Sequence, residues 1–123
     1  MVTQEQIEEV KNRLIANYQP DKIILFGSYA RGDAREDSDL DLIIVKDSAE
    51  NQNRLDRYSD AIIAIRGTRS AKGLVKGIEL DLFVYTSDEL NQLNHPYNFF
   101  ITNALREGKV LYEQQRGNIK SVA

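Results

Sequence analysis

Two aspartates separated by one residue, Asp39 and Asp41, are the strongest sign of chemistry in this sequence. They stand at the start of a largely apolar run that predicts a strand over 39–45, and alternate residues of a strand project from the same face. Their backbones are then roughly 6–7 Å apart. Two carboxylates at that spacing can bind one cation together or bridge two.

A third carboxylate, Asp81, interrupts another apolar run, over 78–85, which also predicts a strand. Because neighbouring strands lie about 4.8 Å apart, Asp81 can reach the same point as the first pair. Glu79 shares its face and is an alternative ligand. Three carboxylates so close repel one another unless a cation neutralises them. Oxygen ligands without His or Cys favour Mg²⁺ or Mn²⁺ over Zn²⁺.

The pair Gly27-Ser28 follows a third predicted strand, over 22–26, and opens a short helical turn. Backbone N–H groups at such a turn bind phosphate oxygens, and glycine lets a phosphate approach closely. The Ser28 hydroxyl can donate one more hydrogen bond. Arg31 can contact a phosphate or simply face solvent. A Gly-Ser pair alone is typical of a plain turn, and an Asp-x-Asp alone is typical of a solvated strand end or a helix cap. Together they form a phosphate cradle beside carboxylate-held metal ions, which is what nucleotidyl transfer requires.

Helical periodicity predicts the elements that flank these strands. A first helix is expected over 4–18, with a capping box at Thr3 and Gln6, and a second over 49–66. The apolar face of the second helix comprises Leu55, Tyr58, Ile62 and Ile65. A short helix is expected after Thr86, and a last one from Pro96 to Gly108. The apolar side of the last helix comprises Phe99, Phe100, Ile101, Ala104 and Leu105. An edge strand is expected over 110–112.

The order of these elements predicts the topology. A short connection joins the strands at 22–26 and 39–45, which favours an antiparallel pair. A helical crossover leads on to the strand at 78–85, which favours a parallel pair. The predicted fold is α/β (α+β), a small mixed β-sheet with flanking helices. The chain of 123 residues suggests one domain, expected over 1–116, with 117–123 as a flexible tail.

Composition excludes several classes of protein. The chain has no cysteine, so disulfides, thiolate metal sites and cysteine catalysis are excluded. A net charge of −3 and a pI near 5.2 argue against a general nucleic-acid binder, and no direct nucleic-acid contact is expected. No apolar run is long enough to span a bilayer, and the N-terminus lacks the form of a signal peptide. We therefore expect a cytoplasmic protein without membrane contact.

These motifs resemble a known superfamily. Gly27-Ser28, ten residues and then Asp39-Leu40-Asp41 match the signature of DNA polymerase β-like nucleotidyltransferases. The segments 26–32 (FGSYARG) and 38–42 (SDLDL) are similar to the minimal nucleotidyltransferases, the MntA-type antitoxins. The segment 79–83 (ELDLF) resembles the strand with that family's third carboxylate, and the resemblance covers nearly the whole chain. Tyr29 departs from the pattern, because many members carry arginine there.

The resemblance implies a polymerase β-like nucleotidyltransferase fold and an activity that depends on one or two Mg²⁺ ions. MntA-type proteins form hetero-oligomers with a HEPN-domain ribonuclease toxin and silence it by transferring AMP from ATP to one of its tyrosines. By position, Asp39 and Asp41 would bind the metal ions, and Asp81 would complete the site and help to deprotonate the tyrosine. Gly27 and Ser28 would hold the triphosphate.

Two other functions stay open at this point. A non-catalytic antitoxin would neutralise its partner by occlusion, although the presence of every expected ligand disfavours a dead enzyme. Nucleotidyl transfer to a small molecule usually requires an added substrate domain, for which this chain is short. No residue identifies the base of the nucleotide.

Overall fold

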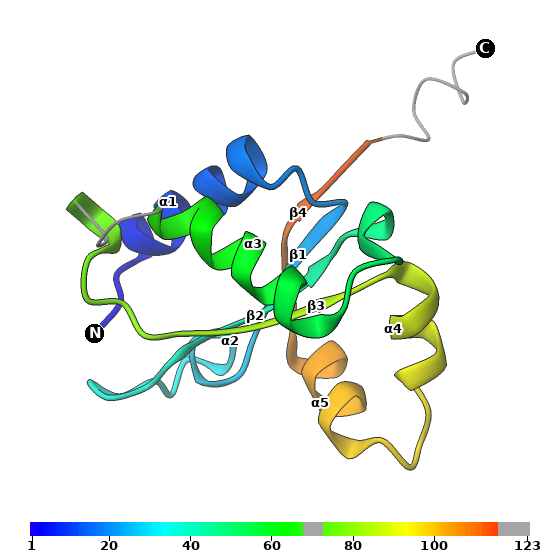
Figure 1. The fold of residues 1–123 in the computed structure, drawn as a ribbon. Helices are drawn as coiled ribbons and strands as arrows, with labels where there is room; N and C mark the ends of the chain where they lie inside the picture. The colour runs from blue at the N-terminus through cyan, green and yellow to red at the C-terminus, as the bar shows by residue number, and fades with distance from the viewer. Residues whose placement is uncertain (68–72, 116–123) are drawn as a thin grey trace.

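The protein forms a four-stranded mixed sheet with helices on both faces, as a computed structural model shows (Figure 1). The structure describes residues 1–67 and 73–115, so the expected tail at 117–123 lies outside the described residues. The strand order is β3-β2-β1-β4. The strands are β1 (Lys22–Phe26), β2 (Leu40–Val45), β3 (Leu80–Tyr85) and β4 (Lys109–Glu113). The pairing of β1 with β2 is antiparallel and that of β2 with β3 is parallel, which confirms the predicted topology.

One face of the sheet is covered by two helices, α1 (Gln4–Asn17) and α3 (Arg54–Arg66). The side chains that β2 sends to this face, Leu40, Leu42 and Ile44, are at most 1% exposed and belong to the larger core cluster. The predicted capping box of α1 is present: the Gln6 N–H donates to Thr3 Oγ1, and the Thr3 N–H donates to Gln6 Oε1. Period-two alternation therefore fixes which side of β2 becomes core.

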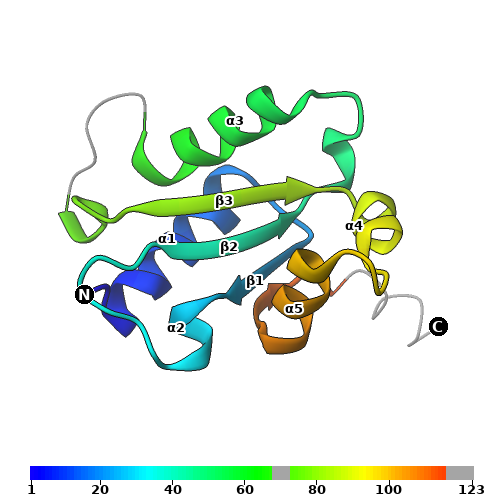
Figure 2. The same ribbon diagram turned by 90° about the horizontal axis from the view of Figure 1, so that it is seen from below.

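The opposite face is covered only over part of its length, by α4 (Ser87–Leu93) and α5 (Phe99–Glu107). The second core cluster lies here and includes Ile43 and Val45 of β2 and Ile101 of α5. In Figure 2, which looks onto this side, none of the drawn helices passes in front of the starts of β2 and β3. The strand starts are thus the open part of the sheet.

The start of α3 corrects the sequence analysis. The helix begins at Arg54 rather than Ala49, because the Asn53 side chain accepts a hydrogen bond from the Asp56 N–H and a separate 3₁₀ turn occupies Asp47–Ala49. Its buried face also differs. Leu55 and Tyr58 are 71% and 41% exposed, whereas Arg57 is only 4% exposed.

The start of α5 corrects a second expectation. The helix begins at Phe99 rather than Pro96, because Asn98 caps it by accepting a hydrogen bond from the Ile101 N–H. Ile101 and Ala104 are buried, as predicted, but Phe99 and Phe100 remain 73% and 47% exposed. They stand in the first turn of α5, where the helix has only begun to pack on the sheet. None of the helices within 1–67 and 73–115 has the length and apolar character needed to cross a membrane.

Candidate active site

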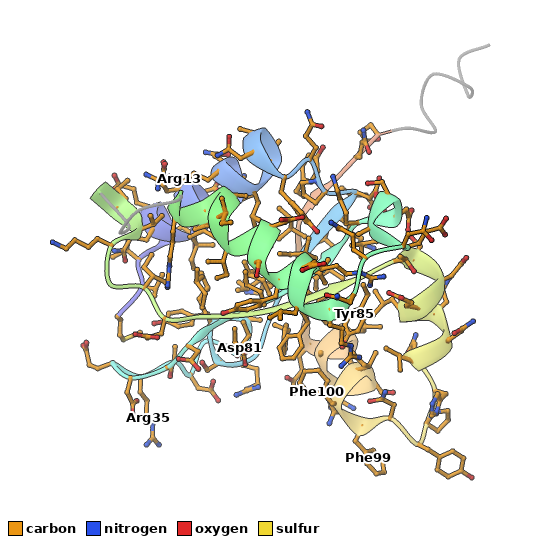
Figure 3. The ribbon with its side chains drawn as sticks, viewed as in Figure 1. Arg13, Arg35, Asp81, Tyr85, Phe99 and Phe100 are labelled. Carbon is orange, nitrogen blue, oxygen red and sulfur yellow. The ribbon has the colours of Figure 1, made fainter. Side chains whose placement is uncertain are left out.

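Two of the three predicted metal-binding aspartates are direct neighbours in the sheet. The parallel register of β2 and β3 pairs Asp41 with Asp81. The next residues on the same face of the two strands are the apolar pair Ile43 and Phe83. Asp39 lies just before β2, one alternation earlier. Asp81 is exposed on the open side of the sheet, as Figure 3 shows, and Asp41 is partly buried. The topology therefore gathers carboxylates that are distant in the sequence.

The pKa values of Asp41 and Asp81 reflect their burial and their proximity to other aspartates. Burial raises the pKa of Asp41 to about 6, and the negative charges of Asp81 and Asp39 add to this effect, while Arg31 opposes it. Burial also raises the pKa of Asp81, with a further contribution from Asp39. A carboxyl group whose pKa is raised in this way is held in an environment that disfavours its own charge. A bound cation would relieve that cost.

The three aspartates are close enough to repel one another but do not form a finished metal cage. Within 1–67 and 73–115, no three side chains of His, Cys, Asp or Glu converge tightly enough to hold a metal ion as they stand. Asp39 is exposed and precedes the strand, so its side chain has the freedom to turn toward the other two. Glu79 also precedes its strand and is exposed, whereas Asp81 is inside the sheet and in register with Asp41. Geometry therefore favours Asp81 over Glu79.

The glycine of the predicted phosphate turn touches the carboxylates. The antiparallel register of β1 and β2 pairs Phe26 with Asp41, so Gly27 comes next to the same aspartate. A Cβ atom at Gly27 would lie 2.1 Å from Asp41 Oδ2, and the backbone has φ +74° and ψ −154°. Only glycine adopts this conformation readily. The turn and the Asp41 carboxylate thus pack against each other with no room for a side chain between them.

A four-residue helix, α2 (Ser28–Arg31), follows this glycine. The first N–H groups of a helix have no partner within it, so those at Ser28 and Tyr29 are free of helical bonds. The turn closes through the N–H groups of Ala30 and Arg31, which donate to the Gly27 carbonyl. Ser28 therefore stands at the open end of the turn, one residue after the glycine that packs against Asp41.

Arg31 is near the site but is engaged elsewhere. Its Nη1 lies 3.1 Å from Glu107 Oε2, and its Nε lies 3.3 Å from Asp33 Oδ2. The sequence analysis gave no role to Glu107, the last residue of α5. The sequence offered one sign of this ion pair, which is that Glu107 is an acidic residue at the end of the last predicted helix.

Tyr29, which stands where many family members carry arginine, is part of the packing. Its ring is partly buried against the larger core cluster, and its hydroxyl accepts a hydrogen bond from the Val2 N–H at 2.9 Å. The residue thus fastens the N-terminal segment to α2 and does not replace an arginine at the phosphate turn.

Comparison with known proteins gives the class that this fold and site define. The fold is that of nucleotidyltransferases: a crystal structure of "a putative nucleotidyltransferase from Sulfolobus solfataricus" superposes with a TM-score of 0.60 at 18% identity, over 91% of this chain and 81% of that one. A second structure, "the toxin-antitoxin with AMP-PNP", superposes with a TM-score of 0.53 at 19% identity, over 94% and 82%.

Sequence comparison gives the family. The model of the family "Polymerase beta, Nucleotidyltransferase" matches residues 8–117, and the chain belongs to this family. The "Putative protein adenylyltransferase MJ0604" of Methanocaldococcus jannaschii is 40% identical over 91% of this chain and 100% of its own length. The "Protein adenylyltransferase MntA" of Aphanizomenon flos-aquae is 29% identical over 89% of this chain and 68% of its own length. These relatives confirm the resemblance to minimal nucleotidyltransferases.

Proposed function

We propose that this protein is a Mg²⁺-dependent adenylyltransferase that transfers AMP from ATP to a tyrosine of a partner HEPN ribonuclease toxin and thereby acts as its antitoxin. The observation that carries the proposal is the juxtaposition of Asp41, Asp81 and Gly27 at the open end of the sheet. Relatives named protein adenylyltransferase and a similarly folded toxin–antitoxin protein support the choice of donor and partner.

The donor set suits the expected metal. Asp39, Asp41 and Asp81 offer only carboxylate oxygens, which Mg²⁺ prefers. The raised pKa values of Asp41 and Asp81 indicate negative charge that a cation would neutralise. Asp39 and Asp41 would hold the metal with Asp81, after a rotation of the exposed Asp39 side chain. When bound, Mg²⁺ would neutralise the triphosphate and stabilise the charge that develops on the transferred phosphoryl group.

The residues of the chain itself perform the remaining steps. The N–H groups at the start of α2 and the Ser28 hydroxyl hold phosphate oxygens and fix the α-phosphorus in line with the incoming tyrosine. The tyrosine oxygen forms a bond to this phosphorus as the bond to the bridging oxygen breaks, and pyrophosphate leaves with the electron pair. Asp81, the more exposed of the two paired aspartates, accepts the hydroxyl proton.

A mass measurement tests this proposal. The purified chain is incubated with ATP, Mg²⁺ and the candidate HEPN partner, and the mass of that partner is followed. We expect a gain of one or more AMP units that disappears in the double variant Asp39→Ala/Asp41→Ala. Asp37→Ala is the matched control, because Asp37 is an exposed carboxylate in the same connection and should leave transfer intact.

The competing readings give different results in the same experiment. Neutralisation of the toxin that persists in the double variant, with no change in mass, would show occlusion and overturn the enzymatic proposal. Transfer of AMP to small hydroxylated molecules but not to a protein would show the third function.

A further inference from the structure

An aromatic cluster made of Phe26, Phe83 and Phe100 adjoins the candidate site on the same face of the sheet. Phe26 pairs directly with Asp41 and is followed by Gly27, while Phe83 lies two residues beyond Asp81. Phe100 of α5 packs on both rings, with centroid distances of 5.7 Å to Phe26 and 5.1 Å to Phe83. The aromatic cluster therefore lies directly beside the aspartates on this face of the sheet.

Phe100 is the member of this cluster that faces outward. Phe26 is only 7% exposed, whereas Phe100 is 47% exposed although two rings support it. In Figure 3, Phe100 lies between Asp81 and Phe99, below the sheet, and Phe99 projects farther away from it. The supporting rings hold Phe100 at fixed tilts of 87° and 58°, which leaves the rest of its surface available to a flat partner.

We propose that the exposed surface of Phe100 stacks with the base of the nucleotide bound at this site. The inference rests on the proposed function, which places a nucleoside triphosphate on the turn at Gly27-Ser28. A nucleotide held there by its phosphates must extend its base away from the aspartates. Toward Glu79 and Glu36 the surroundings are exposed and acidic, whereas along β2 and β3 they are apolar. A neutral, planar base fits the apolar direction.

Stacking on an aromatic ring has a consequence for specificity. Every base has a π-face, so a stacking contact tolerates different bases and favours the larger purines. The cluster offers ring surfaces only and carries no group that could read the edge of the base. ATP and GTP should therefore bind with similar affinity, and both should bind more tightly than CTP or UTP.

Calorimetric titration of the full chain in Mg²⁺ tests the inference, with ATP and inorganic tripolyphosphate as the two probes. Phe100→Leu should weaken ATP binding by about 5- to 100-fold, the effect of losing one stacked base, and should leave tripolyphosphate within about twofold. Phe100→Trp should retain ATP affinity. Phe99→Leu is the matched control, since it removes the neighbouring aromatic residue, which is 73% exposed, and should change neither titration.

The possible results separate this inference from the function on which it rests. ATP binding by Phe100→Leu at wild-type affinity overturns the stacking contact, and a simultaneous loss of partner binding would assign the ring to the partner protein instead. A loss of both probes in Phe100→Leu would mean that the ring supports the fold of the site, which also overturns stacking. If the wild-type chain binds neither probe, the proposed function itself fails.

Discussion

Charged side chains gather at both ends of strands β2 and β3, and their partners differ between the two ends. At the start of the strands, Asp41 and Asp81 lie side by side, and neither takes part in an ion pair within the described residues. At the far end, the nearly buried Arg57 binds Glu89 through both guanidinium Nη atoms, at 2.6 and 3.2 Å. Like charges meet in one place, and opposite charges meet in the other.

The pKa directions follow this division. Burial and neighbouring aspartates raise the pKa of Asp41 to about 6, whereas the hydrogen bond from Arg57 lowers the pKa of Glu89. Arg57 also donates to the carbonyl oxygens of residues in the turn before α3 and of Val84 in β3. The ion pair at the far end thus stabilises the fold. The repulsion between aspartates at the near end is unfavourable, and a bound cation would relieve it.

The largest effect should come from removing one charge of the repelling pair. Asp41→Asn should lower AMP transfer by more than about 100-fold, because the proposed function makes Asp41 a direct metal ligand and losing a direct ligand exceeds the effect of losing an outer one. In the absence of Mg²⁺, Asp41→Asn should raise the melting temperature of the protein at pH 7 to 8. The native state binds more protons than the unfolded state between the ordinary pKa of aspartate and about 6, so the wild-type chain loses stability as pH rises through this window. Asp41→Asn should flatten that slope, and an unchanged slope would contradict the assignment.

The next effect concerns the paired end. Arg57→Met should lower the free energy of unfolding by about 3 kcal/mol, because it leaves Glu89 and several carbonyl oxygens without their donor. Urea denaturation measures the change. Arg54→Met is a suitable control, because Arg54 precedes it in the same helix and is exposed. The folded fraction of Arg57→Met should retain its affinity for ATP. Equal stability of both variants would show that the pair does not support the fold.

A smaller effect is expected from substitution of Gly27, which packs against Asp41 at the near end of the strands. Gly27→Ala should cost about 1–3 kcal/mol of stability, the usual range for a residue forced into a conformation that glycine alone tolerates. It should also push the Asp41 carboxylate aside and reduce AMP transfer together with tripolyphosphate affinity. Gly32→Ala serves as the control, because it also has a positive φ, of +89°, but has open space around its Cβ position. Comparable losses of transfer in both variants would contradict the steric argument.

The smallest effect is the acid sensitivity of the paired end. The lowered pKa of Glu89 means that its contribution is present above the ordinary pKa of glutamate and is lost as pH falls through the folded value. Glu89→Gln should therefore reduce the fall in stability that the wild-type chain shows below about pH 4.5. This slope has the opposite sign to that of Asp41. Thermal melts between pH 3 and pH 7 would resolve the two slopes. If the wild-type chain and Glu89→Gln lose stability equally at acid pH, Glu89 does not contribute to this slope.

Period-two alternation made the sheet and the paired aspartates predictable. Residues of β2 and β3 alternate so regularly that the face of Asp41 and Asp81 followed from the sequence, and the connection lengths indicated parallel pairing. The capping box at Thr3 placed the start of α1 correctly, because its reciprocal hydrogen bonds are local, and a second box is present at Thr86, where a helix was also expected. Local rules therefore located the strands and the carboxylates at their starts.

The remaining features depend on tertiary contacts that no local pattern records. Arg57 is buried because distant carbonyl oxygens and Glu89 surround it, and its burial turns Leu55 outward. The outward position of Phe100 likewise depends on where α5 meets β1 and β3. The partnership of Arg31 with Glu107 depends on the same docking of α5. Hydrophobic periodicity alone would bury Leu55 and Phe100 and expose Arg57, the reverse of what the structure shows.

The parallel register of β2 and β3 also has a consequence for the order of folding events. Asp41 and Asp81 meet only after the chain between them has crossed over through α3 and closed a long loop, which is an entropically costly step. Parallel pairings between distant segments form slowly compared with hairpins such as β1 and β2. We therefore expect Asp41 and Asp81 to come together late in folding, after the β1–β2 hairpin has formed.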